Sequence, residues 1–348
     1  NSESIFLGAV VDYGYGFAVA LTEMASGKVI VYNVDHDVET LIASLLSYNT
    51  KEIVVYEDLN MGVKRELSFL NDVLLSTIAS KEILNDYKYL YEHVDNINYQ
   101  DVIELLLTYL NDTQMKTLHH LREIEVISDA GHMKIDYNSI SNLELVESLR
   151  SGNVKNSLWD FLDHTETSMG KRLLRSYIVK PVVDKEAILL RQLQITDLRD
   201  DYILFDDLGE NLKQVYDLER LNAKLAYGNA NPLDSLRLKK SLSVVPEILS
   251  DLSKYPNFKN IINIDPLTHL EQLIESAILE DAKAIVREGG IFKDGFNQEL
   301  DDARSIQENG QAWILNLEAE EREKTGISNL KVGYNRVFGY FIEVSKGN

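Results

Sequence analysis

The hydrophobic pattern at the start of the chain predicts a small sheet covered by helices. Residues 4–20 and 28–34 are rich in Ile, Val, Phe and Ala, and the turn pair Ser26-Gly27 separates them, as in an antiparallel hairpin. Residues 38–48 then carry apolar side chains at helical spacing, and residues 53–56 form a short apolar run typical of a buried strand. This order of strands and helices indicates an α/β domain.

A helix is predicted over residues 98–121, and from about Ser139 onward the helical pattern dominates. Apolar residues recur at helical spacing over 98–121, and few strands are expected between Leu143 and Lys324. Three positions resemble helix starts, because a short polar side chain there can accept a hydrogen bond from the first turn. They are Ser141 with Glu144 as a capping box, Asp184 after Pro181, and Asn231 before Pro232.

The strongest periodicity lies near the end of the chain and predicts a helix from Gly295 to Lys324. Its seam alternates spacings of four and three and consists of Phe296, Leu300, Ala303, Gln307, Gly310, Ile314 and Leu317. Such a helix would be about 45 Å long at about 1.5 Å per residue. Apolar residues over 267–278 supply an antiparallel partner. The pair fits either a lever or an ordinary helix pair in a bundle.

After Gly326, which suits the end of a helix, the pattern changes to strands. Residues 330–334 and 340–344 flank a turn, so a β-hairpin is expected there. The edge strand would be open where the sequence stops at Asn348, and intact proteins rarely leave such an edge exposed. Because the first residue is also not Met, we expect an internal piece of a longer protein.

Composition and charge narrow the class of protein. Hydrophobic residues make up 45% and charged residues 26%, which is typical of a globular protein. Cysteine is absent, which excludes disulfides and thiolate metal sites and suits a reducing cytoplasm. No apolar run is long enough for a membrane span. The net charge of −21 argues against broad phosphate contact, although residues 331–348 carry a local positive excess from Lys331, Arg336 and Lys346.

Several motifs, in order, resemble those of the MutS family. The run LDHTETSMGKRLLR at 162–175 is similar to the core signature Leu-Asp-x-Thr-x-Thr-x-Met-Gly-x-Arg-x-Leu, with Tyr177 where the family often has tryptophan. Two further runs resemble core motifs of the family, YDLERL at 216–221 and GNANP at 228–232. Three more resemble the junction of lever and clamp, EREKTGI at 321–327, LKVGYN at 330–335 and GYF at 339–341.

The resemblance implies a multidomain α+β architecture. It implies an RNase H-like α/β connector over 1–112, a helical core with long antiparallel lever helices over 113–318, and the end of the lever with the first clamp strands over 319–348. For the intact protein it implies binding of mismatched double-stranded DNA, ATP-driven clamp movement, docking of a MutL-type matchmaker, a homodimer and a cytoplasmic location without membrane contact.

No catalytic site is expected in this chain itself. The phosphate-binding motif Gly-x-x-x-x-Gly-Lys-Ser/Thr does not occur, so ATP and magnesium would bind elsewhere in an intact DNA-dependent ATPase. The family's mismatch reader carries Phe-x-Glu, which Phe341-Ile342-Glu343 matches literally. Because that match lies in the predicted hairpin, we expect it to be an ordinary strand segment.

The candidate DNA contacts are Lys331, Arg336 and Lys346. By resemblance the clamp touches the DNA backbone without reading bases, which flexible cations on a hairpin can do. The same cations would also keep an edge strand soluble, and both interpretations stay open.

Two other functions remain open from the sequence. One is a MutS-like scaffold that lacks the mismatch reader and acts on branched DNA. The other is a metal-dependent nuclease, because RNase H-like nucleases hold two metal ions with clustered carboxylates. Asp12 ends the first strand, and Glu57-Asp58 follow the strand at 53–56, so these carboxylates could meet at one edge of the sheet. The adjacent His119 and His120 would point apart on a helix and could not chelate a metal together.

Overall fold

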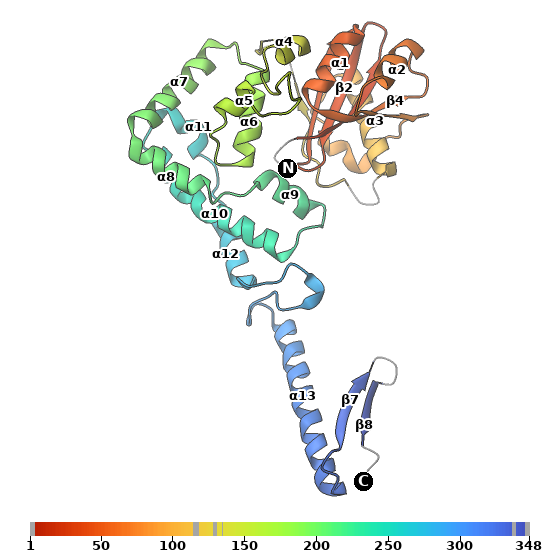
Figure 1. The fold of residues 1–348 in the computed structure, drawn as a ribbon, viewed down its shortest axis with the longest axis vertical. Helices are drawn as coiled ribbons and strands as arrows, with labels where there is room; N and C mark the ends of the chain where they lie inside the picture. The colour runs from red at the N-terminus through yellow and green to blue at the C-terminus, as the bar shows by residue number, and fades with distance from the viewer. Residues whose placement is uncertain (1–3, 114–117, 128–130, 134, 336–338, 345–348) are drawn as a thin grey trace. The chain divides into compact units, whose positions relative to one another are not determined.

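A computed structural model of the chain describes residues 4–113, 118–127, 131–133, 135–335 and 339–344, without the side chains of residues 137, 306–309, 311–313, 334 and 335 (Figure 1). By its internal contacts the chain divides into two units. The first comprises residues 1–275 with 283–288, and the second comprises residues 276–282 with 289–348. The predicted domain boundaries after residues 112 and 318 stay predictions.

A mixed six-stranded sheet forms the beginning of the first unit. Its strands are β1 (Phe6–Asp12), β2 (Gly16–Glu23), β3 (Lys28–Asp35), β4 (Thr50–Tyr56), β5 (Leu74–Ile78) and β6 (Glu125–Val126). They lie in the order β5-β4-β1-β2-β3-β6. The first three strands are antiparallel, whereas β4 is parallel to β1, β5 is parallel to β4 and β6 is parallel to β3. The predicted hairpin at Ser26-Gly27 and the strand at 53–56 are confirmed.

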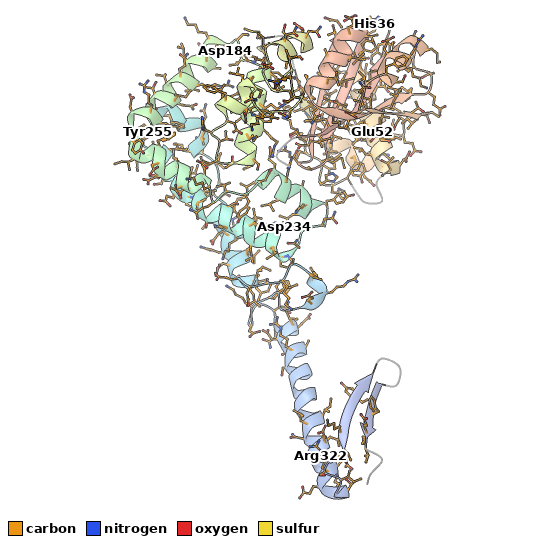
Figure 2. The ribbon with its side chains drawn as sticks, in the orientation of Figure 1. His36, Glu52, Asp184, Asp234, Tyr255 and Arg322 are labelled. Atoms are coloured by element: carbon orange, nitrogen blue, oxygen red, sulfur yellow. The ribbon has the colours of Figure 1, made fainter. Side chains whose placement is uncertain are left out.

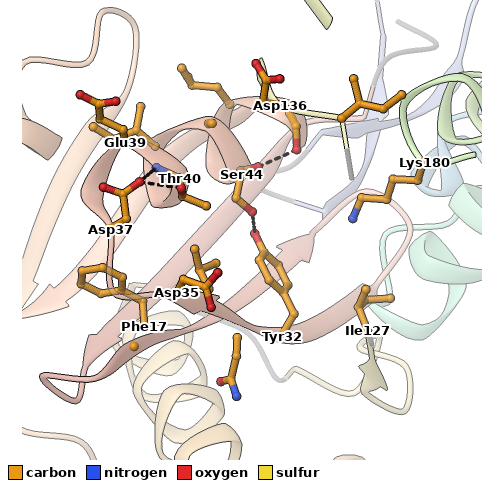
Figure 3. Close-up of a pocket in the computed structure, with 18 of the residues that line it drawn as sticks. Phe17, Tyr32, Asp35, Asp37, Glu39, Thr40, Ser44, Ile127, Asp136 and Lys180 are labelled. Carbon is orange, nitrogen blue, oxygen red and sulfur yellow. Dashed lines mark hydrogen bonds between the residues drawn. The ribbon is translucent and has the colours of Figure 1, made fainter. Parts of the chain in front are cut away.

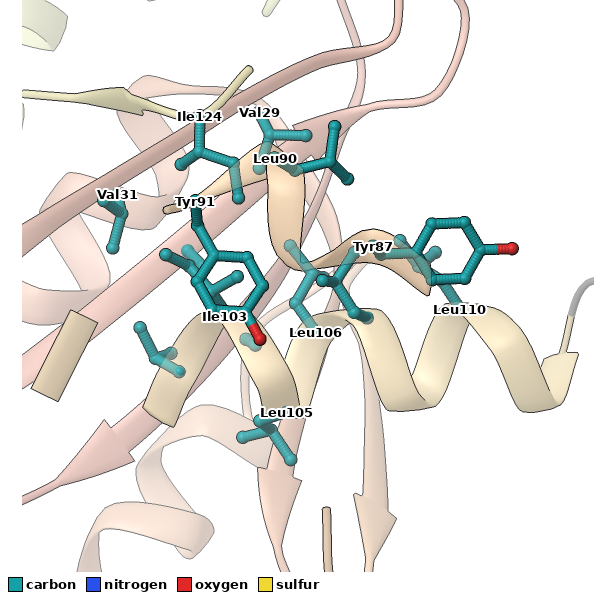
Figure 4. Packing of buried hydrophobic residues seen from close by; sticks show 14 of the residues in the cluster. Val29, Val31, Tyr87, Leu90, Tyr91, Ile103, Leu105, Leu106, Leu110 and Ile124 are labelled. Carbon is teal, nitrogen blue, oxygen red and sulfur yellow. The ribbon is translucent and has the colours of Figure 1, made fainter. Parts of the chain in front are cut away.

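Helices cover both faces of this sheet (Figure 1). Alternation along the strands sends Val10 and Phe17 toward one face and Ala9 and Val11 toward the other, so each face buries its own apolar cluster. Helices α1 (Val38–Ser47) and α2 (Met61–Ser68) pack on the first face. The helix α3 (Ile97–Thr113) and the short 3₁₀ helix η1 (Asn85–Leu90) pack on the second, where Figure 4 shows their leucines and tyrosines against β3.

Two predicted helix limits were wrong. The helix predicted over 98–121 ends at Thr113, after the weak helix formers Asn111 and Asp112. Beyond it, the backbone N–H of Leu118 donates to the hydroxyl of Tyr87, and Leu118 is fully buried in the sheet's second cluster.

The capping box predicted at Ser141 and Glu144 is also wrong. Asp136 accepts a hydrogen bond from the Ser139 amide and starts α4 (Tyr137–Asn142) one turn earlier. Glu144 has a positive φ of 48°, and its carboxylate accepts from the Leu149 amide instead of a helix start.

The rest of the first unit is mostly helical. Its helices are α5 (Leu158–Leu162), α6 (Ser168–Val179), α7 (Lys185–Asp200), α8 (Tyr202–Leu212), α9 (Leu218–Ala226), α10 (Pro232–Leu252), η2 (Pro256–Phe258), α11 (Lys259–Ile262), the start of α12 (Thr268–Ala277) and η3 (Val286–Glu288). Asp184 and Asn231 cap α7 and α10 as predicted, with Pro232 in the first turn of α10. No strand is assigned between Leu143 and Lys324, where every residue is described, which confirms the expected scarcity of strands.

The second unit contains one long helix and a hairpin. Helix α13 (Gln298–Thr325) is 28 residues long and ends at Gly326, whose left-handed φ of 69° confirms the predicted helix end. The strands β7 (Lys331–Asn335) and β8 (Gly339–Glu343) pair antiparallel, as predicted. The antiparallel pairing of α13 with residues 267–278 stays a prediction. Among the described residues, no helix combines the length and the apolarity that crossing a membrane requires.

A close contact at Gly27 fixes the turn between β2 and β3. The Arg122 amide donates to the Gly27 carbonyl at 2.8 Å, so the chain beyond α3 lies directly on this turn. A Cβ atom on Gly27 would lie 2.0 Å from the backbone oxygen of His120, and the φ of Gly27 is 69°. Only glycine fits both the space and the backbone conformation.

We predict that Gly27→Ala lowers the free energy of unfolding by about 3 kcal/mol or more, because the methyl group must displace backbone. The matched control is Gly14→Ala, where φ is 78° and nothing lies within 4 Å of the added Cβ. That control should lower the free energy of unfolding by only about 1 kcal/mol, the cost of an alanine in the left-handed region. Urea denaturation of the two variants measures the difference, and equal losses would contradict the role assigned to the Gly27 contact.

Candidate functional site

The first motif begins α6 through short polar contacts. The hydroxyl of Thr167 accepts from the Gly170 amide at 2.9 Å, and a Cβ on Gly170 would lie 3.0 Å from that hydroxyl oxygen. Asp163 accepts from the Thr165 hydroxyl at 2.6 Å and pairs with Lys171 at 2.6 Å. Burial opposes ionisation of Asp163, but these two partners lower its pKa below the usual value. The motif is therefore a helix start that is fastened to its own first turn.

Arg172 joins this motif to the second one. Its guanidinium donates to both carboxylate oxygens of Asp217, at 2.6 and 2.9 Å, and to Glu219 at 2.7 Å. Only 10% of the Arg172 side chain is exposed, so these charges are largely removed from water. The hydrogen bonds to Asp217 raise the pKa of Arg172, and the guanidinium in turn lowers the pKa of Asp217 despite its burial. Asp217 also caps α9, so one carboxylate orients two helices.

The same charges reach the sheet region, which we define as residues 4–127. Glu219 pairs with Arg122 at 3.5 Å, and Arg220 pairs with Glu23 at 3.4 Å. Glu23 is 4% exposed and also accepts from the Ser26 hydroxyl at 2.6 Å. The second motif thus connects the helical part of the first unit to the turn between β2 and β3.

The third motif is a buried helix cap. Asn231 accepts from the Asp234 amide, and the Asp234 carboxylate accepts from the Asn231 amide, so both form a capping box (Asp234 is labelled in Figure 2). Asp234 is 1% exposed, and Lys224 and Arg237 neutralise it at 3.2 and 3.1 Å. This motif fixes the entry of the chain into α10.

In the second unit, Arg322 fastens α13 to the hairpin (labelled in Figure 2). Its Nε donates to the carbonyl of Leu330 at 2.7 Å, and its guanidinium pairs with Glu318 one turn earlier. Glu318 accepts from the Val332 amide at 3.1 Å, and Leu330 is buried at the junction. Two side chains of the helix therefore bind the backbone at the start of β7. We name Arg322, Glu318, Leu330 and Val332 the helix–hairpin clip.

Of the three predicted DNA contacts, only Lys331 lies within the described residues. It is exposed on β7, and the strand register places it opposite Glu343 of β8. Arg336 and Lys346 lie outside the described residues. Phe341 lies opposite Gly333, where a Cβ would come 2.7 Å from the ring. The Phe-x-Glu match is thus part of β8, as predicted, and its ring covers a glycine of the neighbouring strand.

The carboxylates of the nuclease hypothesis lie at one edge of the sheet, because β1 and β4 are parallel neighbours. Asp12 is engaged locally, with its Oδ1 2.8 Å from the Gly14 amide and 3.1 Å from His36 Nε2. Glu57 and Asp58 are exposed. Within the described part of the chain, no group of three His, Asp or Glu side chains is placed to hold a metal ion.

An ionic cluster on the second face of the sheet was missed by the sequence. Lys81 lies 2.6 Å from both Asp101 and Glu104, which are one turn apart on α3. The hydroxyls of Tyr13 and Tyr56 donate to Asp101 at 2.7 and 3.1 Å. Burial raises the pKa of Asp101, but the hydrogen bonds from Lys81 and Tyr13 outweigh it and bring this pKa below the usual value. Only the spacing of Asp101 and Glu104 was visible in the sequence, because Lys81 lies in a loop.

The MutS domain III profile matches residues 138–333, which is more than half of the chain. The chain belongs to the MutS family. It is 39% identical to the DNA mismatch repair protein MutS of Bacillus cytotoxicus, and 38% identical to the proteins of that name from Bacillus cereus and Bacillus thuringiensis. These alignments include the whole chain but only 39–40% of each relative, so the chain spans about two fifths of their length.

The matched region of this MutS-family chain contains all three core motifs and the helix–hairpin clip. Their shared property is structural: each motif carries a buried or half-buried charge that is satisfied by a helix end or by another motif. The motifs that identified the MutS family thus hold the helices together.

We predict that the ionic cluster at Asp101 makes stability depend on acid. A carboxylate whose folded pKa is depressed stabilises the fold above its unfolded pKa, and this contribution is lost as the pH falls through the folded value. Asp101→Asn should therefore lower the free energy of unfolding by about 2 kcal/mol at neutral pH. The difference in this free energy between variant and wild type should close below about pH 4.

Urea denaturation across this pH range measures the effect. Asp112→Asn is the matched control, since Asp112 is an exposed carboxylate near the end of the same helix. It should change stability by less than about 0.5 kcal/mol at any pH. A gap for Asp101→Asn that stays constant with pH would contradict the assignment.

Proposed function

We propose that this chain is the central part of a MutS-type DNA mismatch-repair protein and works as its mechanical linkage. Family membership and the fraction of the relatives that it spans support this proposal. In this proposal residues 1–112 are the connector, residues 113–318 the core and lever, and residues 319–348 the end of the lever with the start of the clamp. ATP hydrolysis, with magnesium, and base reading belong to other parts of the intact protein.

The observation that carries this proposal is the helix–hairpin clip. A 28-residue helix is about 42 Å long at about 1.5 Å per residue, so a small rotation at one end displaces the other by several ångströms. Such a displacement reaches the hairpin only if the joint is stiff. Arg322 binds the backbone of Leu330, just before β7, and Glu318 binds that of Val332 within β7, while the buried Leu330 side chain fills the corner. The hairpin therefore follows the end of α13.

The sheet region suits the proposed connector. The order β3-β2-β1-β4-β5, with three antiparallel strands followed by parallel ones, supports an RNase H-like domain. The ion pair of Arg220 with Glu23 attaches this region to the helices of the core. In the intact protein we expect it to dock a MutL-type partner, while a homodimer binds mismatched double-stranded DNA in the cytoplasm.

Loosening the clip tests the linkage. In the full-length protein, Arg322→Ala should leave mismatch binding without nucleotide within about threefold of the wild type, and should lower the stimulation of ATP hydrolysis by mismatched duplex about fivefold or more. The reason is that DNA and nucleotide would still bind, but the loosened clip would no longer transmit movement between α13 and the hairpin.

Lys324→Ala is the matched control. Lys324 lies on the same turn of α13 and pairs with Glu320 and Glu321 instead of the hairpin. The control should keep wild-type stimulation, and a urea melt should show that both variants fold. Undiminished stimulation in Arg322→Ala would refute the linkage through the clip.

Lys331 is proposed as a contact to the DNA backbone. Each phosphate contact contributes a slope of about −0.9 to a plot of log K against log salt concentration, so Lys331→Ala should make this slope shallower by about one. The loss of affinity should be the same for matched and mismatched duplexes, because a lysine on phosphate reads no base.

Lys254→Ala is the control, since Lys254 is an exposed lysine of the helical region that pairs with Asp251. It should leave the slope unchanged. An unchanged slope in Lys331→Ala would remove Lys331 from the interface.

A further inference from the structure

The loop before α13 contains a dipeptide that is prone to a spontaneous reaction. Asp294-Gly295 is the single Asp-Gly pair of the sequence. It lies between η3, which ends at Glu288, and Asn297, which caps α13. The pair belongs to the second unit, and every residue from 276 to 305 is described.

An Asp-Gly pair can rearrange without an enzyme. The backbone nitrogen of the glycine attacks the side-chain carbon Cγ of the aspartate, so a C–N bond forms while the C–OH bond of the carboxyl group breaks. The nitrogen gives up its proton, one water molecule leaves, and a five-membered succinimide ring results. Water then opens the ring at either carbonyl, which returns aspartate or gives isoaspartate, whose main chain runs through Cγ. Glycine favours the attack because no side chain stands beside its nitrogen.

Two exposed aspartates of the first unit show the contrast. Asp37 and Asp136 line a cavity of about 1380 Å³ beside β3, and each caps a helix by accepting a hydrogen bond from its first turn (Figure 3). The residues that follow them are Val38 and Tyr137, which are bulky and slow the attack in any peptide. Asp294 differs from both, because a glycine follows it and 94% of its side chain is exposed.

The attacking nitrogen is engaged in the folded chain. The Gly295 amide donates to Oδ2 of Asp301 at 2.8 Å, and Asp301 lies in the first turn of α13. Gly295 has a left-handed φ of 81°, which this turn into the helix requires and which glycine adopts without cost. Because the nitrogen of the succinimide carries no hydrogen, this hydrogen bond is lost when the ring closes. The bond therefore stabilises the aspartate form relative to the ring.

The carboxylate under attack is engaged as well. Nη1 of Arg304 donates to Oδ1 of Asp294 at 2.5 Å, and Nη2 donates to the carbonyl of Phe292 at 2.9 Å. Arg304 also pairs with Asp301 at 3.6 Å, so one guanidinium joins the loop to the first turns of α13. The succinimide has no carboxylate, so ring closure also breaks the ion pair with Asp294.

We propose that Asp294 is a site of spontaneous isomerisation to isoaspartate, and that the hydrogen bond from Gly295 to Asp301 slows this reaction in the folded chain. The reactants are the chain itself and water. In isoaspartate the carboxylate stands on Cα and the main chain is one atom longer, so the contacts to Asp301 and Arg304 are no longer made together. Ageing of the chain therefore loosens the start of α13.

Incubation of the full chain at neutral pH in water enriched in oxygen-18 measures the reaction. Each passage through the ring places one oxygen-18 atom in residue 294. Trypsin releases this residue in the fragment 294–304, because Lys293 precedes it and Arg304 ends it, and fragmentation in the mass spectrometer locates the label. Folded chain should take up the label about tenfold more slowly than the same chain unfolded in guanidinium chloride, which makes neither contact.

Variants separate the hydrogen bond from a general effect of charge. Asp301→Ala should take up the label about fivefold faster than the wild type, because the Gly295 amide is released. Asp301→Asn keeps a side-chain oxygen that accepts from this amide and should stay within about twofold of the wild type. Asp302→Ala is the matched control, since Asp302 is the next residue of α13 and binds Gln298 instead of Gly295.

Asp294→Glu tests the assignment to residue 294. A glutamate there would have to close a six-membered ring, so the label should disappear from this position. Circular dichroism of every variant should show the helix content of the wild type.

Four results would overturn the proposal. They are equal rates in folded and unfolded wild type, a rate in Asp301→Ala no faster than in Asp302→Ala, a rate in Asp301→Asn as fast as in Asp301→Ala, and a labelled fragment without isoaspartate. The proposal goes beyond the mechanical linkage and does not rest on it. The assay contains no DNA and no nucleotide, so failure of this proposal and failure of the linkage are distinguishable.

Discussion

The guanidinium of Arg172 holds separate stretches of the chain in one arrangement. It neutralises Asp217 and Glu219. Asp217 in turn caps α9, and Glu219 pairs with Arg122 of the sheet region. The ion pairs of a largely buried arginine with two carboxylates are costly to break, because any one of the charges left alone would be stranded away from water. These ion pairs therefore hold the helical region in one geometry. The neighbouring ion pair of Arg220 with Glu23 fixes that region to the sheet in the same way.

The same principle recurs at the far end of the matched region. Arg322 and Glu318 satisfy each other and also satisfy backbone groups of the hairpin. A charged pair that also binds backbone groups fixes the relative direction of the two elements it joins, which apolar packing alone does poorly. This explains why a chain with a net charge of −21 devotes several of its few arginines to contacts between elements. These arginine side chains hold separate elements together.

Local features of the fold were readable from the sequence. Helix starts at Asp184 and Asn231, the helix end at Gly326 and the β7–β8 hairpin follow from side chains that act on their own backbone neighbours. The family was also readable, because its motifs are contiguous. Where local signals competed, the sequence misled: Ser141 and Glu144 form a good capping box on paper, but Asp136 starts the helix one turn earlier.

Contacts between distant residues were decided only by the tertiary structure. Lys81 meets Asp101 and Glu104, and Arg172 meets Asp217, because folded elements bring them together over 20 to 45 positions of sequence. The pattern of apolar residues fixes which face of an element is buried, but it carries no information on which charge lies opposite. The sequence by itself determined the elements, the capped helix ends and the family. The tertiary structure decided which charges pair, since pairing depends on neighbours that are remote along the chain.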